Sequence, residues 1–197
     1  MKQMTKPFTF SAADVLLVID VINDFEHDDG DRLLASFRDR LEPMVETIVK
    51  ARTAAIPIIY VNDERDRWDS NAPALTKTAL ESDRGFEIVE RLAPCPGDHF
   101  LLKHRYSAFD HTPLDLLLRQ LDVDRLVLIG SATEGCIVQT AIDAREQGLK
   151  TTILADACAS THPELETTAL HYAEQVVGAH ISHTQVAQAA YTEVVRE

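Results

Sequence analysis

Short apolar runs alternate along this chain with segments of helical periodicity, and this alternation constrains the fold more than any other feature. The strand-like runs are Val15–Ile19, Pro57–Val61, Phe100–Leu102, Arg125–Ile129, Thr151–Ala155 and a weak one near Val177–Ile181. After the first run, apolar residues between Leu33 and Val49 recur at intervals of three and four, as on one face of a helix. Strands that alternate with helices form a parallel sheet covered on both faces. The sequence therefore predicts an α/β fold.

Local signals predict where some of these helices begin. A Thr-Pro pair precedes a helix expected over Leu114–Leu121, and Pro163 is expected in the first turn of another. A last helix is expected from about Thr184 to Val195. By contrast, the stretch from Arg65 to Ala79 is polar and poorly periodic, which is typical of a long loop near an active site.

Composition bounds the functions that such a chain can have. Its 197 residues suit one domain spanning residues 1–197, and no linker-like stretch divides them. A net charge of −13 argues against a nucleic-acid partner and against an anionic membrane surface. Three cysteines without metal-site spacing, no signal-peptide pattern and no run of about 20 apolar residues favour a cytoplasmic protein.

Three chemically useful residues follow strand-like runs. Asp20 follows the first run, Lys103 follows the third, and Cys136 lies in the small-residue turn Gly130–Val138 after the fourth. The carboxyl edge of a parallel sheet is where ligands bind. A thiol in the first helical turn lies near unpaired N–H groups, which predicts a lowered pKa for Cys136. Taken singly, each residue also fits a structural role, since free cysteines are often simply buried.

The motifs around these residues occur together and in order. The stretches Val18–Phe25, Lys103–Phe109 and Gly130–Val138 resemble the isochorismatase-like cysteine hydrolase superfamily, which includes nicotinamidases, N-carbamoylsarcosine amidohydrolases and isochorismatases. The resemblance runs from about Val15 to Ile181. It implies a Rossmann-like three-layer α/β/α fold whose central, mostly parallel six-stranded sheet has the order 3-2-1-4-5-6.

The resemblance also implies roles for individual residues. Asp20, Lys103 and Cys136 would form a catalytic triad, with Asp20 facing Cys136 and Lys103 reaching in from the third strand. A cis peptide bond would join Ser131 to Ala132, and the N–H groups of Ala132 and Cys136 would form an oxyanion hole. Members of the superfamily are commonly oligomers, so a homodimer or homotetramer is expected.

These residues predict hydrolysis of a small-molecule substrate. Asp20 would take the proton of Cys136, the thiolate would attack a carbonyl carbon, and Lys103 would support both charges. The expected bond is the C–N bond of an amide, carbamoyl compound or lactam, cleaved through a thioester. One alternative is an isochorismatase-type vinyl-ether hydrolase that uses Asp20 and Lys103. Another is a non-catalytic binding protein on the same fold.

The substrate pocket and the absence of a metal are further expectations. Residues expected to bind substrate lie on loops at the predicted edge: Asn23, Phe25, Trp68, Tyr106, Phe109, Thr133 and Ile137. Nicotinamidases of this superfamily carry a metal-binding Asp-x-His segment after the second strand. The matching stretch here, Val61–Asp69, contains no histidine, so neither a metal nor another cofactor is expected.

Overall fold

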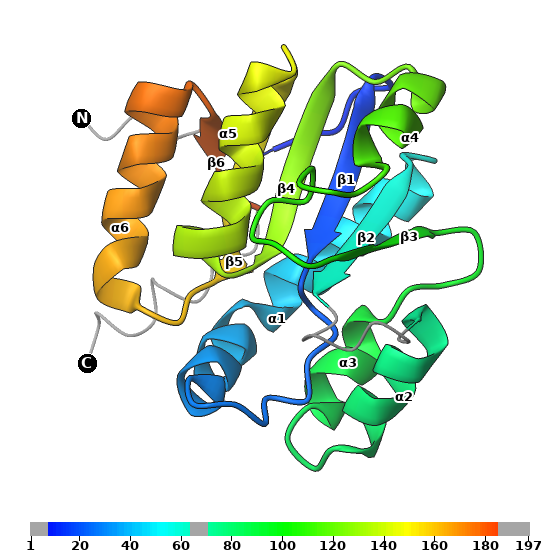
Figure 1. Cartoon of the computed structure of the whole chain (residues 1–197), viewed down its shortest axis with the longest axis vertical. Helices are drawn as coiled ribbons and strands as arrows, with labels where there is room; N and C mark the ends of the chain where they lie inside the picture. The colour runs from blue at the N-terminus through cyan, green and yellow to red at the C-terminus, as the bar shows by residue number, and fades with distance from the viewer. Residues whose placement is uncertain (1–7, 64–70, 185–197) are drawn as a thin grey trace, which may run out of the picture.

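A six-stranded parallel sheet forms the centre of the protein (Figure 1), in a computed structural model that describes residues 8–63 and 71–184. The strands follow one another across the sheet in the order β3-β2-β1-β4-β5-β6, which confirms the predicted order and fold class. Their bounds are β1 Asp14–Ile19, β2 Ile58–Asp63, β3 His99–Lys103, β4 Arg125–Ser131, β5 Lys150–Ala159 and β6 His180–Ser182.

Helices cover both faces of this sheet, and each face has its own hydrophobic core. Their bounds are α1 Gly30–Thr53, α2 Ala72–Glu81, α3 Phe86–Leu92, α4 Leu114–Leu121, α5 Val138–Glu146 and α6 Pro163–Tyr172, with π-helical turns η1 Thr133–Ile137 and η2 Ala173–Val177. On β1, Leu16 and Val18 pack on the side of α1 and α3. Leu17 and Ile19 alternate with them and pack on the side of α4 and α5. This alternation gives the strand a continuous apolar sequence.

The centre of the sheet is the point where the strand order reverses. β1 pairs with β4, and Ile19 lies opposite Gly130 at the carboxyl ends of these strands. Gly130 has a φ of +119°, and a Cβ there would lie 2.0 Å from the carbonyl oxygen of Ile19. Only glycine fits this close approach. The chain leaves the two strands in opposite directions, which creates a crevice where ligands bind in such sheets.

Other parts of the fold differ from the sequence-based expectation. The region predicted as a loop up to Ala79 contains α2, whose start is capped by the Asn71 side chain, which accepts a hydrogen bond from Ala74 N at 3.0 Å. The short helix α3 was also missed, since seven residues are too few to show a clear period. β6 begins later than predicted because Val177 belongs to η2. The description ends at Thr184, so the helix predicted from Thr184 to Val195 lies outside the described residues except for its first residue.

Candidate active site

Of the three residues that the motifs single out, Lys103 contacts both of the others through its ammonium group. Its Nζ lies 2.8 Å from Asp20 Oδ2 and 3.3 Å from Cys136 Sγ. It also donates a hydrogen bond to the carbonyl oxygen of Arg105 at 3.0 Å. Lys103 is only 1% exposed and Cys136 only 8%, so the contacts are largely shielded from water. The fold thus brings together residues from the ends of β1 and β3 and from the turn after β4.

Asp20 is held in place from several sides. Its backbone has a φ of +51°, a conformation uncommon outside glycine and usually imposed by surrounding structure. Asp63 N donates a hydrogen bond to Asp20 Oδ1 at 2.7 Å, and Ser131 Oγ donates to the Asp20 carbonyl oxygen at 3.0 Å. The buried Asn62 side chain pairs with both the N–H and the carbonyl of Ile22. These bonds fix the carboxylate against Lys103.

Cys136 lies in the π-helical turn η1, which leads directly into α5. The turn closes with a hydrogen bond from Ile137 N to the Ala132 carbonyl oxygen at 3.2 Å. The peptide bond between Ser131 and Ala132, just before the turn, is cis. Single π-helical turns are frequent at functional sites, and this one carries the Cys136 thiol.

Burial and charge set the protonation of the triad. Burial raises the pKa of Asp20, and the charge of Lys103 only partly offsets this. Burial alone would lower the pKa of Lys103, but the Asp20 carboxylate, together with the nearby Cys136 sulfur, outweighs burial and raises the value. Burial, reinforced by Asp20, raises the pKa of Cys136 to about 12. The lowered thiol pKa predicted from the sequence is therefore wrong: at neutral pH the thiol keeps its proton.

A hollow of about 240 Å³ opens beside Asp20, and we call it the Asp20 hollow. Its lining consists of residues from the ends of β1, β2 and β4 and from α1: Asp20, Ile22, Asn23, His27, Leu33, Asn62, Asp63, Ser131 and Ala132. Of the predicted substrate-binding residues, Asn23 lies here, although its Oδ1 also accepts a hydrogen bond from Phe25 N at 2.7 Å. Ala132, predicted for the oxyanion hole, is part of the same wall. The hollow therefore reaches both the carboxylate and the turn before Cys136.

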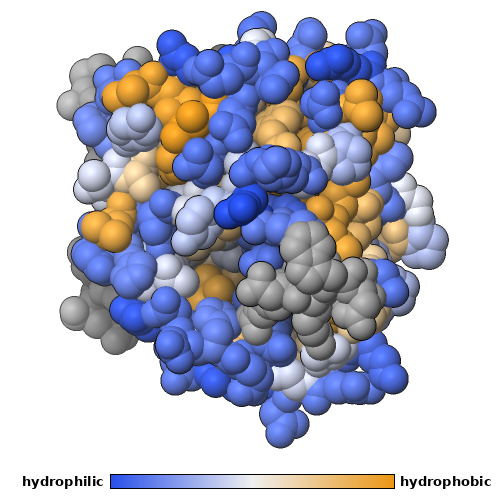
Figure 2. Space-filling model, in the orientation of Figure 1, coloured by the Kyte–Doolittle hydropathy of each residue, from blue (hydrophilic) through white to orange (hydrophobic). Residues whose placement is uncertain are grey.

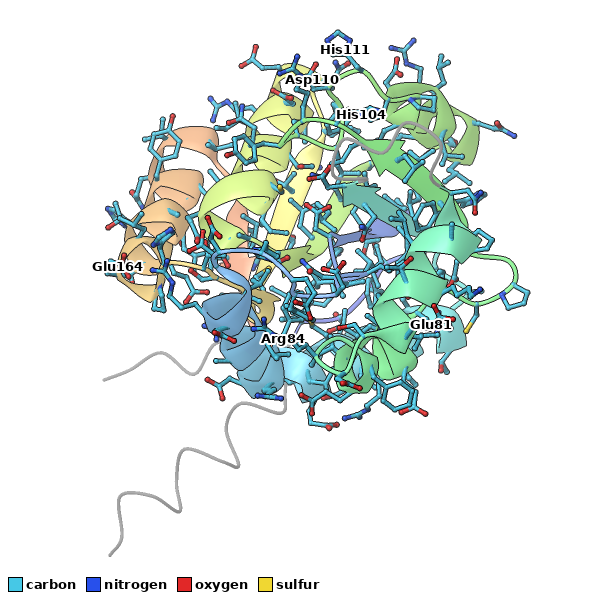
Figure 3. The ribbon with its side chains drawn as sticks, turned by 60° about the horizontal axis from the view of Figure 1, so that its bottom comes forward. Glu81, Arg84, His104, Asp110, His111 and Glu164 are labelled. Carbon is cyan, nitrogen blue, oxygen red and sulfur yellow. The ribbon has the colours of Figure 1, made fainter. Side chains whose placement is uncertain are left out.

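Two predicted substrate contacts line a different hollow, which we call the α5 hollow. Tyr106 and Phe109 border this space of about 600 Å³ together with Gln139 of α5. Its rim carries Asp110 and His111, which lie at the edge of the molecule (Figure 3). Tyr106 is 71% exposed, yet its ring comes near Gly135 of η1, the turn that also carries Cys136.

Three other predicted pocket residues belong to the protein interior. Phe25 is fully buried and packs edge-on against Phe37, with ring centroids 5.5 Å apart. Ile137 is fully buried in the core on the α5 side. The buried Thr133 donates its hydroxyl hydrogen toward the Ala159 carbonyl oxygen at 3.1 Å. Their burial was not foreseen, because a loop position in sequence does not reveal which way a side chain turns, and their substrate contacts stay predictions. Trp68 lies outside the described residues.

Several residues of the site were missed. Asn62 and Asp63 line the Asp20 hollow at the end of β2, and the strand-end argument that selected Asp20 applies equally to them. His27 also lines it, from the loop before α1. Glu134 of η1 accepts a hydrogen bond from the loop between β5 and α6 through its carboxylate. Within residues 8–63 and 71–184, no group of three or more histidine, cysteine or acidic residues is placed to hold a metal ion.

Comparison with known proteins now decides the family. The Isochorismatase domain model matches residues 14–185. This chain belongs to the isochorismatase family. The chain is 34% identical over 174 residues to an uncharacterized isochorismatase family protein YaaI of Bacillus subtilis, covering 87% of this chain and 95% of that protein. It is 32% identical over 204 residues to a ureidoacrylate amidohydrolase RutB of Methylorubrum extorquens, covering 88% and 81%.

Solved structures of other isochorismatase-family proteins share its fold. The N-carbamoylsarcosine amidase from Thermoplasma acidophilum superposes with a TM-score of 0.68 at 28% identity, over 87% of this chain and 96% of that one. The nicotinamidase/pyrazinamidase PncA from Bacillus subtilis gives 0.70 at 28% identity, over 86% and 99%. The superfamily resemblance predicted from the motifs is thus confirmed, and the chain is a member of a hydrolase family with amidohydrolase relatives.

Proposed function

We propose that this isochorismatase-family chain is a cysteine amidohydrolase that cleaves a C–N bond of a small molecule through a thioester on Cys136. One observation carries the proposal: the buried Lys103 ammonium contacts both the Asp20 carboxylate at 2.8 Å and the Cys136 sulfur at 3.3 Å. A thiol, a base and a cation within mutual reach are the parts that nucleophilic catalysis requires. The raised pKa of Asp20 makes it a stronger base than an ordinary aspartate.

In the first half of the reaction, the thiol proton passes to Asp20 as the sulfur attacks the substrate carbonyl carbon. A C–S bond forms, and the carbonyl electron pair moves onto the oxygen, where the N–H groups of Ala132 and Cys136 would stabilise it. The tetrahedral intermediate then collapses. The C–N bond breaks, the leaving nitrogen takes the proton from Asp20, and a thioester remains on Cys136.

In the second half, Asp20 removes a proton from water, and the water oxygen attacks the thioester carbon. The C–S bond breaks, the acid product leaves, and the proton held by Asp20 returns to the sulfur. Lys103 stays protonated throughout, since Asp20 and Cys136 raise its pKa. It stabilises whichever neighbour carries the negative charge.

The relatives and the size of the site support this reaction class. A ureidoacrylate amidohydrolase, an N-carbamoylsarcosine amidase and a nicotinamidase/pyrazinamidase are all similar to this chain. The Asp20 hollow, about 240 Å³, suits a small compound better than a peptide or polymer. We therefore propose small primary amides, carbamoyl compounds and lactams as the substrates to examine.

The test is a panel of these three compound classes, with ammonia or amine release measured for wild type and Cys136→Ala. We expect turnover only in wild type, together with an acyl adduct that peptide mass mapping places on Cys136 during turnover. Full activity of Cys136→Ala would contradict the thioester route. If that variant hydrolysed vinyl ethers while Asp20→Ala did not, the isochorismatase-type alternative would replace it.

A homo-oligomeric assembly is a further proposal. α6 and η2 leave apolar side chains on the surface: Leu165 is 49%, Tyr172 46% and Val176 56% exposed. Figure 2 shows apolar patches on the α6 side of this face amid hydrophilic surface. Exposed apolar patches often mark protein interfaces. Light scattering of the purified protein is expected to give a dimer or tetramer mass, and a monomer at all concentrations would contradict this. The cytoplasmic location stays a prediction.

A further inference from the structure

The carboxylate of Glu134 is bound by a neighbouring loop, although Glu134 itself belongs to η1, the turn that carries Cys136 and that we call the nucleophile turn. Its Oε1 accepts hydrogen bonds from Thr161 N at 2.9 Å, Thr161 Oγ1 at 2.6 Å and His162 N at 2.9 Å. Its Oε2 accepts one from Ser160 Oγ at 2.8 Å. Burial alone would raise the pKa of Glu134, but these donors outweigh burial and lower it. The side chain is therefore a fully engaged carboxylate at neutral pH.

These bonds connect the nucleophile turn to the start of α6. The donors occupy the short connection between β5 and α6, whose first residue is Pro163. Glu134 stands two positions before Cys136 in η1. Negative charge is favourable at a helix N-terminus, so the position suits a carboxylate. A change in the Glu134 contacts would thus move the backbone that carries the thiol.

A second set of contacts, which is more buried, connects the same turn to α6 and α1. Thr133 Oγ1 lies 3.2 Å from Glu166 Oε1, and Glu166 forms a largely buried ion pair with Arg40 at 2.8 Å. Ser160 N donates a hydrogen bond to Ser36 Oγ of α1 at 2.9 Å. The turn is therefore tied to α6 and, through it, to α1. Glu166 belongs to α6, Ser36 and Arg40 belong to α1, and Ser160 lies in the connection between β5 and α6.

We propose that Glu134 is a positioning residue that holds the Cys136 thiol against Lys103. It does so through the backbone of η1 and the donors at residues 160–162, without touching substrate. The inference rests on the proposed function in one respect only, namely that Cys136 is the nucleophile. The Sγ–Nζ distance of 3.3 Å leaves little room for displacement. Small displacements of a reacting group reduce rates strongly even when binding is unchanged.

The first test compares Glu134→Ala with Glu134→Gln. Alanine removes all four contacts, and we expect kcat to fall on the order of 10–100-fold while KM stays within about threefold. Glutamine can keep the three donors on its oxygen and donate its own N–H to Ser160 Oγ, so it should retain kcat within about fivefold. An unchanged kcat in Glu134→Ala overturns the proposal. Equal losses in both variants also overturn it, because they would assign the effect to charge.

The matched control is an acidic residue of α6, the helix that follows the donors to Glu134. Glu164 stands at the outer edge of the molecule near the start of α6 (Figure 3), and its side chain is 68% exposed. Glu164→Ala removes a carboxylate that contacts the His162 ring at 3.3 Å, but it leaves all four hydrogen bonds to Glu134 in place. We expect wild-type kcat, KM and unfolding midpoint for this control. A loss equal to that of Glu134→Ala would show that any acidic residue near α6 has this effect, and would overturn the specific role.

The second test needs no substrate, so its failure is distinguishable from failure of the proposed function. Lys103→Met should slow alkylation of Cys136 about tenfold, the effect of raising the thiol pKa by about one unit. In a Glu134→Ala background this slowing should shrink to about twofold, because the thiol no longer lies against Lys103. The full slowing should return with Glu134→Gln. An equal effect of Lys103→Met in all three backgrounds overturns the proposal.

Thr161→Val provides a third test that can be used if Glu134→Ala does not fold. This substitution removes one side-chain donor from the Glu134 carboxylate and keeps the shape of the side chain. We expect kcat to fall about threefold to tenfold, with an unchanged unfolding midpoint, as for a small displacement of the nucleophile. Wild-type kcat in folded Thr161→Val overturns the proposal.

Discussion

The two ends of β1 carry the same residue type in opposite circumstances. Asp14, at the amino end, is 1% exposed and accepts two hydrogen bonds from Arg125, at 2.8 and 2.6 Å, and two from Ser11, at 2.7 and 2.9 Å. Burial alone would raise the pKa of Asp14, but these donors outweigh it and lower the value. Asp20, after the carboxyl end, contacts Lys103, Cys136 and one backbone N–H, and its pKa is raised.

Under the proposed function, the difference separates a structural carboxylate, Asp14, from a reactive one, Asp20. The hydrogen bonds to Asp14 stabilise its charged form, so the carboxylate stays deprotonated at neutral pH. Asp20 shares a single cation with a neutral thiol, so it keeps a higher proton affinity inside a largely dry site. Perturbed groups of this kind cluster where chemistry occurs. Burial alone is therefore a poor guide to function, while incompletely compensated burial is a good one.

The largest expected effect is on catalytic activity, and it should differ between substitutions at the two ends of β1. Asp20→Asn should reduce kcat/KM about 10²- to 10⁴-fold, the contribution typical of a general acid–base residue. Asp14→Asn should leave kcat/KM of the folded protein within about twofold, because Asp14 lies at the other edge of the sheet. Steady-state hydrolysis of the best amide found in the panel measures both. Equal losses of kcat/KM in the two variants would contradict the distinction between Asp14 and Asp20.

The next effect is on stability, where Asp14 rather than Asp20 is expected to matter. Asp14→Asn should lower the free energy of unfolding by roughly 3 kcal/mol, since it leaves the partly buried Arg125 without its carboxylate. Urea unfolding followed by circular dichroism measures this. The double variant Asp14→Asn/Arg125→Met is the control, and it should recover part of the loss. A loss below about 0.5 kcal/mol, the range of ordinary surface substitutions, would mean that the pair contributes nothing.

A smaller effect concerns the backbone at the carboxyl end of β1. Gly130→Ala places a Cβ 2.0 Å from the Ile19 carbonyl oxygen, at a φ of +119°. The two strands must move apart, which should cost about 1–3 kcal/mol of stability, as other overpacked sites do. Gly97→Ala is a suitable control, because its φ is +102° but nothing lies within 4 Å of the added Cβ. If both variants lost the same stability, the loss would come from the positive φ alone.

The smallest effect is a dependence of stability on pH. Because the folded pKa of Asp14 lies below the ordinary value of 3.8, its stabilisation is fully present above about pH 5 and is lost as the pH falls through the folded pKa. The stability difference between wild type and Asp14→Asn should therefore shrink from about pH 5 to about pH 3. Asp20, whose pKa is raised, acts with the opposite sign. A difference that grows toward low pH would contradict the sign assigned to Asp14.

Sequence reasoning located the strands and the three motif residues well, because both depend on local pattern. Apolar runs mark buried parallel strands, and a residue just after such a run must lie at the sheet edge. The direction of the Cys136 pKa was wrong because it depends on burial and on the Asp20 charge, neither of which is local. The burial of Phe25 and Thr133 was not foreseen for a related reason, since side-chain direction depends on tertiary packing. Glu134 gave no signal, because its donors lie at residues 160–162, far along the chain.

The alkylation rate of Cys136 as a function of pH tests the central claim most directly, measured in wild type, Asp20→Asn and Asp14→Asn, each with Cys95→Ser. Asp20 raises the thiol pKa while Lys103 lowers it. Asp20→Asn should therefore shift the profile to lower pH and speed alkylation at neutral pH, even as hydrolysis is lost. Asp14→Asn should match wild type. Identical profiles in all three proteins would show that Cys136 and Asp20 are not coupled, and would contradict the account.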